Sequence, residues 1–174
     1  MSLSSKLLKL NLPKTVFNDT IDNFMLWQMY NIHTYLCELA VSCGLDNSYT
    51  PLYNLLFSCI RYDKLSILNL CSQGSDKHKL VWSKYFPNST FHTQITSGGD
   101  TFNIIMVDNN LLTTLSLTNI ISKLDTGGIC IIRHAIPNDN SPHIMSLFTS
   151  TQYKLVRLVT IPNRHPSVLL IVNI

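Results

Sequence analysis

The sequence predicts an α/β domain with a mainly parallel sheet, an antiparallel C-terminal hairpin and helices at the N-terminus. After Arg61, short apolar runs alternate with helical stretches, which is typical of a parallel sheet covered by helices. The last two apolar runs, 154–161 and 167–174, are separated only by PNRHP. Because a parallel crossover needs about a dozen residues, we expect these runs to pair as an antiparallel hairpin.

Composition favours a single domain with a nearly neutral surface. The chain has 174 residues, 45% of them hydrophobic, which allows one packed core and no separate second domain. We assign residues 1–60 as an N-terminal helical cover and 61–174 as the core. Charged residues make up only 13% and the net charge is +3, so we expect a protein partner or a homo-oligomer and consider RNA contact possible.

Cysteines and the N-terminal stretch indicate the compartment. Five cysteines form no CxxC pair and most lie in apolar runs, so we expect small core residues in a reducing environment. The N-terminus lacks a signal-peptide pattern, and no apolar run reaches 18 residues. We therefore expect a cytoplasmic protein, in the host cytoplasm if the chain is viral, without membrane contact.

Two helices are expected before the sheet. Apolar residues at helical spacing predict a helix over 19–43, capped by Asp19 or Thr20 and ended by Gly44. A second helix over 51–60 starts with Pro51, which suits an early helical position.

The remaining elements follow in order. The expected helices are 76–86, capped by Ser75 or Asp76, then 113–124 and 141–150. The expected strands before the hairpin are 65–71, a weak one at 90–95, 102–108, and 129–135 after a turn at Gly127 and Gly128.

The first candidate site is the loop that follows strand 65–71. Its residues precede a helix whose first N–H groups face the carboxyl edge of the sheet, where open α/β sheets bind ligands. An ordinary strand-to-helix turn explains the loop equally simply, since only one glycine is present. The candidate cofactor-binding residues here are Asn69, Cys71, Ser72, Gln73, Gly74 and Ser75.

Two further segments bring polar residues to the same edge. Strand 102–108 delivers Asp108 and Asn109, and the acid could hold a metal or orient a substrate hydroxyl. Alternatively, Asp108 or Asn109 simply turns the chain and caps the next helix. Strand 129–135 carries Arg133, a possible phosphate contact, and His134, a possible proton shuttle, although residues at strand ends often only meet solvent. The other histidines show no metal-ligand spacing.

These segments together resemble class I methyltransferases that bind S-adenosylmethionine, over about two thirds of the chain. The matching stretches are ILNLCSQGSDKHKLVWSKYFPN, FNIIMVDN and LDTGGICIIRHA. In motif style they are similar to coronavirus-type cap 2'-O-methyltransferases and to macrocin O-methyltransferases. The resemblance implies a reduced Rossmann-like methyltransferase fold, with Asp108 and Asn109 joining the loop residues as cofactor contacts.

The chain departs from that family at several positions. The family has an acid at the end of its second strand that holds the ribose. Here the corresponding stretch, 90–99, reads TFHTQITSGG and contains no carboxylate, and the next acid is Asp100. Only residues 95–101 separate Gln94 from the strand at Phe102, so we expect the family's third strand to be missing. Of the viral Lys-Asp-Lys-Glu tetrad, Asp108 can match the Asp, whereas Arg133 stands at the position of the second lysine and the last strand offers no Glu.

We therefore expect a degenerate methyltransferase-like domain, from a virus, that has lost catalysis and binds a protein partner or acts as a scaffold. No cofactor is expected in this interpretation, and a groove near Lys77, Arg133 and His134 is a secondary place for RNA.

The alternative is an active S-adenosylmethionine-dependent O-methyltransferase, for which the RNA cap ribose is one candidate acceptor. The loop 72–75 would then face the methionine end of the cofactor, Asp108 would position the acceptor, and His134 would take its proton. An unrelated α/β binding module is a third interpretation.

Overall fold

The structure is a computed structural model that describes residues 33–45, 49–70, 75–95, 98–113, 117–135, 153–159 and 167–173. The predicted helix 141–150, the proposed caps Asp19 and Thr20, and the loop 71–74 lie outside these residues.

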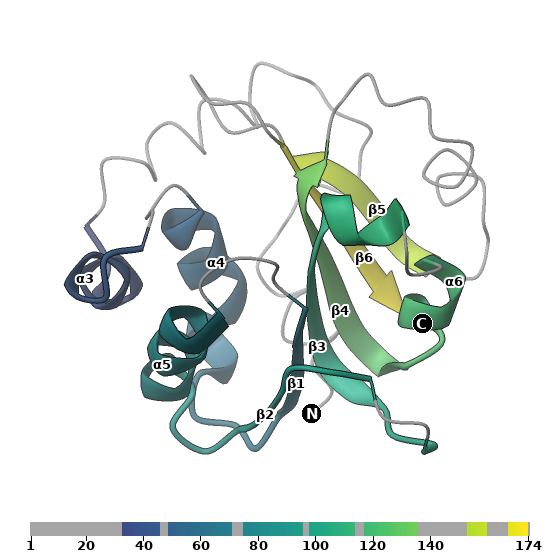
Figure 1. The fold of residues 1–174 in the computed structure, drawn as a ribbon, viewed down its shortest axis with the longest axis horizontal. Coiled ribbons are helices and arrows are strands. Elements are labelled where there is room, and N and C mark those ends of the chain that lie inside the picture. Colours follow the sequence, from purple (N-terminus) through teal and green to yellow (C-terminus); the bar gives the residue numbers. More distant parts are fainter. Residues whose placement is uncertain are drawn as a thin grey trace.

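A six-stranded sheet in the order β2-β1-β3-β4-β6-β5 organises the domain (Figure 1). The first four strands run parallel, while β6 pairs antiparallel with both β4 and β5. The predicted α/β class and the C-terminal hairpin are therefore confirmed. The strands are β1 (Ser66–Leu70), β2 (Thr90–His92), β3 (Phe102–Asp108), β4 (Leu124–Ala135), β5 (Tyr153–Val159) and β6 (Ser167–Asn173).

Helices cover both faces of the sheet, as Figure 1 shows. One face carries α3 (Tyr35–Ser42), α4 (Thr50–Phe57) with the short 3-10 helix η1 (Ser58–Ile60), and α5 (Ser75–Tyr85). The other face carries the 3-10 helix η2 (Asn109–Thr113) and α6 (Leu117–Ile121).

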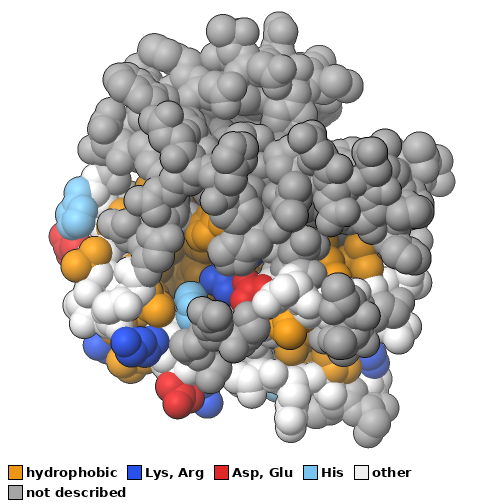
Figure 2. Space-filling view, turned by 45° about the horizontal axis from the view of Figure 1, so that its top comes forward, with side chains coloured by type: hydrophobic (Ala, Val, Ile, Leu, Met, Phe, Trp, Pro, Cys, Tyr) orange, Lys and Arg blue, Asp and Glu red, His pale blue; other side chains and the backbone are white. Residues whose placement is uncertain are grey.

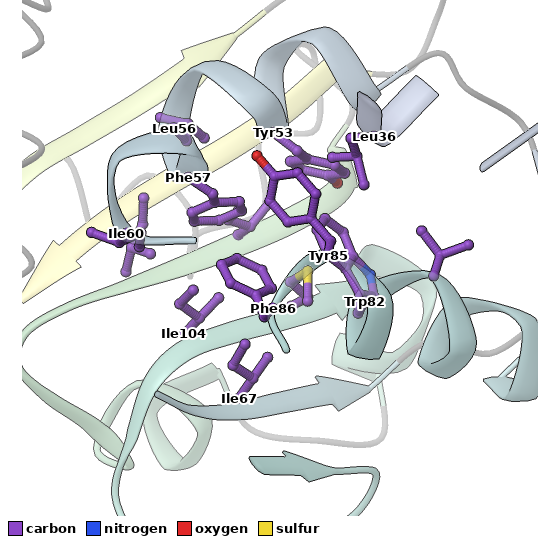
Figure 3. Close-up of a cluster of buried hydrophobic side chains, with 14 of the residues drawn as sticks. Leu36, Tyr53, Leu56, Phe57, Ile60, Ile67, Trp82, Tyr85, Phe86 and Ile104 are labelled. Carbon is purple, nitrogen blue, oxygen red and sulfur yellow. The ribbon is translucent and has the colours of Figure 1, made fainter. Parts of the chain in front are cut away.

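The alternation of side chains along each strand divides the core into two layers. In β3, Ile104 and Met106 pack beneath α3, α4 and α5, whereas Ile105 and Val107 pack against α6. Aromatic rings fill the larger layer in edge-on and stacked pairs between the helices and the sheet (Figure 3). These rings belong to Tyr53, Phe57, Trp82, Tyr85 and Phe86.

The predicted helix 19–43 is wrong where it passes through residues 33–34. Thr34 is extended, with φ −111° and ψ 160°, and its side chain accepts a hydrogen bond from the N–H of Cys37, so α3 begins at Tyr35. The predicted end is confirmed: Gly44 has φ +65°, and the N–H of Leu45 donates to the carbonyl of Ala40 at 2.9 Å.

Gly127 and Gly128 do not form a turn before a strand, since β4 already begins at Leu124. The pairing moves from Phe102 with Leu124 to Ile104 with Ile129, so β4 holds extra residues in an irregular segment. Gly127 adopts φ +78°, and a Cβ at Gly128 would lie 2.9 Å from backbone oxygens. The glycines are therefore required within the strand.

Two helix predictions need smaller corrections. Ser75 and Asp76 are the first residues of α5 and not its cap. The helix expected over 113–124 is split into η2 and α6, and it ends early because β4 starts at Leu124.

The short edge strand β2 confirms the expected loss of the family's third strand. β2 pairs with β1 and stands last in the sheet. Among the described residues between His92 and Phe102, none belongs to a strand. Among the described strands, the sheet therefore ends one strand earlier on this side than the family resemblance implies.

The cysteines follow the expectation in part. Cys37 and Cys130 are buried, but Cys59 is exposed because it lies on the outer side of η1, so its predicted core position is wrong. The four described cysteines are free thiols. Among the described helices, none combines the length and the hydropathy that crossing a membrane requires.

Candidate functional site

Buried polar residues gather at the carboxyl edge of the sheet, beneath α5. Asn69, Asp108 and Arg133 are buried near the ends of β1, β3 and β4. Each lies two residues after a side chain of the larger core layer, namely Ile67, Met106 and Ile131. Because side chains alternate across a strand, all three occupy the face that α5 covers.

Asp108 and Arg133 form a buried ion pair. They are register partners in β3 and β4, and Nε of Arg133 donates to Oδ1 of Asp108 at 2.8 Å. Nη2 of Arg133 lies 2.6 Å from the same oxygen, and the two side chains are only 9% and 6% exposed. The idea that Arg133 merely meets solvent at a strand end is therefore wrong. The carboxylate of Asp108 is directed to Arg133 across the strands.

His78 is electrostatically coupled to this pair, although it is not among the site residues predicted from the sequence. It lies in the first turns of α5 and is half-buried. Burial lowers the pKa of His78 most, Arg133 lowers it further, and Asp108 opposes both. The imidazole therefore lies within electrostatic range of the ion pair and favours its neutral form. The one sequence signal was its place near the start of a helix that opens at the carboxyl edge.

Figure 2 shows that a histidine, a basic and an acidic side chain lie next to one another on one face of the molecule. Near the centre of the view, a histidine side chain lies beside a Lys or Arg side chain and an Asp or Glu side chain, with hydrophobic side chains behind them.

The other predicted site residues are placed only in part. Asn69 is buried in β1 and pairs in register with Met106. Ser75 opens α5, Asn109 opens η2, and His134 lies in β4. Cys71, Ser72, Gln73 and Gly74 lie outside the described residues, so the roles predicted for them stay predictions.

At the β2 side of this edge, the described residues directly after the strand offer no carboxylate. After β2 the chain continues with Thr93, Gln94 and Ile95, none of which offers a carboxylate for ribose hydroxyls, and Asp100 is exposed. Because β2 is the edge strand, the wall that the family resemblance implies for the adenine is also missing from the described chain.

Neither a metal site nor an exposed cationic groove at Lys77 and Arg133 is found among the described residues. Within the described ranges, no group of three His, Cys, Asp or Glu side chains could hold a metal ion. Lys77 is exposed on α5, whereas Arg133 is buried, so these two do not form one exposed cationic groove. RNA binding stays a prediction.

Comparison with known proteins places the fold. No protein-family model matches the chain, and no curated protein sequence matches it. The methyltransferase MycE, solved with Mg and SAH, shares 14% identity and a TM-score of 0.55 over 82% of this chain and 49% of MycE. The chain thus spans about half the length of MycE.

Two other structures match over nearly their whole length. A methyltransferase from Geobacter sulfurreducens has 10% identity and a TM-score of 0.55, covering 93% of this chain and 99% of that one. A protein-(glutamine-N5) methyltransferase from Alicyclobacillus acidocaldarius has 10% identity and a TM-score of 0.52, covering 76% and 96%. The expected closeness to viral cap enzymes stays a prediction. The chain has the Rossmann-like fold of class I S-adenosylmethionine-dependent methyltransferases, in a reduced form.

Proposed function

We propose that this chain is a methyltransferase-like domain that has lost methyl transfer and works by binding a partner protein. The observation that carries the proposal is the buried Asp108–Arg133 ion pair. In the family resemblance Asp108 is the acid that would position a methyl acceptor. Here that acid has become part of the packing between β3 and β4.

The energetics of the pair explain why an acceptor would not compete for it. Removing one partner of a buried ion pair costs about 3–5 kcal/mol, because the other charge stays buried without compensation. Both contacts of Arg133 end on Oδ1 of Asp108, whose side chain is only 6% exposed, so an acceptor hydroxyl that drew the carboxylate away from Arg133 would have to repay that cost. The absence of a carboxylate at residues 93–95 supports the same proposal.

Isothermal titration of the full chain with S-adenosylmethionine and S-adenosylhomocysteine tests the loss of function. We expect no binding heat at ligand concentrations up to about 1 mM, which corresponds to less than about 4 kcal/mol of affinity. Micromolar binding that Gly74→Trp abolishes would overturn the proposal. The matched control is Gly99→Trp, because a Cβ at Gly99 meets nothing within 4 Å.

An active O-methyltransferase is the second candidate, and His78 is the observation that favours it. An imidazole with a lowered pKa beside the carboxyl edge is suited to accept a proton from an acceptor hydroxyl. The test is transfer of a labelled methyl group to capped RNA and to small catechols or sugars. Transfer that His78→Gln reduces about a hundredfold would support this candidate over the binding module.

A further inference from the structure

We propose that the outer surface of α3 and α5 binds an acidic, amphipathic segment of a partner protein. This inference rests on the proposed binding function and specifies the partner. Among the described residues, the exposed large hydrophobic side chains all lie on this side of the domain. They are Tyr35, Val41, Tyr62 and Leu80.

The contacts of α3 and α5 make these residues parts of one surface. The two helices pack against each other. At one end, the guanidinium of Arg61 lies 4.2 Å from the ring centroid of Tyr35, and its Nε donates to the carbonyl of Tyr85 at the end of α5. At the other end, a Cβ at Gly44 would lie 3.5 Å from Nζ of Lys77. We define the helix surface as the exposed side chains of α3, α5 and residues 61–64.

One end of the helix surface is already ordered for binding. Arg61 lies within 5.1 Å of the Tyr62 ring centroid and 5.2 Å of the Tyr85 ring centroid, in addition to its contact with Tyr35. Tyrosine and arginine carry a large share of the energy at protein interfaces. Because these side chains are held in place before binding, less conformational entropy is lost when a partner docks.

Charge identifies the kind of partner. The exposed charged residues of the helix surface are two acids, Glu38 and Asp76, and four lysines, Lys64, Lys77, Lys79 and Lys84. The half-buried Arg61 and Asp63 beside them add one charge of each sign, so the excess of positive charge is unchanged. A second copy docked through the same surface would oppose lysines to lysines, which is unfavourable. An acidic segment of a partner protein complements the lysines of the helix surface.

A protein segment suits the surface better than RNA does. Val41 and Leu80 offer aliphatic contact area, which leucine-like side chains of a peptide use and a phosphate backbone does not. The guanidinium of Arg61 also covers one face of the Tyr35 ring, so that face is closed to base stacking. In Figure 2, Lys or Arg side chains and hydrophobic side chains lie next to each other on the left, the side of α3 and α5 in Figure 1.

The experiment uses defined probes and the full chain. Fluorescence anisotropy is recorded with three labelled acidic amphipathic peptides of about 20 residues that differ in the spacing of their leucines, and with a basic counterpart. A single-stranded RNA of about 20 nucleotides is the fifth probe. We expect at least one acidic peptide to bind with a Kd below about 100 μM and to weaken with salt, and the basic peptide not to bind.

Variants locate the binding. Leu80→Glu and Lys77→Glu should each weaken the acidic peptide about tenfold. Thr118→Glu is the matched control, because Thr118 is exposed on α6 at the opposite face, and it should leave the Kd unchanged.

Several outcomes would overturn the inference. These are binding of RNA in preference to every acidic peptide, a dimer that Leu80→Glu converts to monomer, and no peptide binding at all. A parallel titration with S-adenosylmethionine separates the two proposals. Peptide binding together with cofactor binding would overturn the expectation of a chain without cofactor and support the helix surface, whereas no binding in either titration would refute the helix surface alone.

Discussion

The ion pair of Asp108 and Arg133 gives the sharpest prediction about the buried carboxyl edge of the sheet. We consider a double-mutant cycle of Asp108→Leu, Arg133→Met and the combined variant. Each single change leaves one charge in the protein interior without its partner. The combined change replaces both charges with apolar side chains of similar size, which a buried position between two strands accepts.

The expected magnitudes follow from the burial of the pair. Both side chains are less than a tenth exposed, at 9% and 6%, so solvent screening removes little of their attraction. Each single variant should therefore lower the free energy of unfolding by about 3–5 kcal/mol, out of a typical total of about 5–15 kcal/mol. The combined variant should lie within about 1 kcal/mol of wild type, or be more stable.

Urea unfolding followed by circular dichroism measures these values, with unchanged m-values as the check that the compactness of both states is preserved. The coupling energy should be at least about 5 kcal/mol, the sum of the two single losses less the small change in the combined variant. The reasoning is refuted if the combined variant loses the sum of the two single losses within about 0.5 kcal/mol, since additivity would show that the two residues act independently.

Three further predictions concern the fold around this site. Gly128→Ala should lower stability by about 1–3 kcal/mol because the added Cβ meets backbone oxygens at 2.9 Å, whereas Gly99→Ala, with open space, should change it little; equal thermal midpoints for the two would contradict the steric argument. The lowered pKa of His78 means that it binds fewer protons when folded than when unfolded, so the free energy of unfolding should fall as pH drops below the ordinary pKa of 6.5. Chemical denaturation of His78→Gln at pH values on both sides of 6.5 should show a shallower fall. An identical pH profile for both proteins would exclude this contribution of His78. Thr34→Ala should cost about 1 kcal/mol by removing the cap of α3, and an unchanged urea midpoint would show that the cap carries no net energy.

Several elements could be predicted because their signals are local. The strand 102–108, the helix ending at Gly44 and the C-terminal hairpin all follow from apolar periodicity, a glycine after the last turn, and a connection too short for a crossover. The missing third strand could also be predicted, because residues 95–101 are too few to leave the sheet and return.

The sequence by itself determined which residues reach the carboxyl edge, since Asp108 and Arg133 stand at or near the ends of apolar strands. Only the tertiary structure decided what they do there. Their pairing depends on the register between β3 and β4, and the contribution of His78 depends on how α5 crosses that edge. Neither the register nor the position of α5 is encoded in a local pattern, because both arise from the packing of segments distant in the chain. This packing also sets whether a polar side chain meets water or a buried partner.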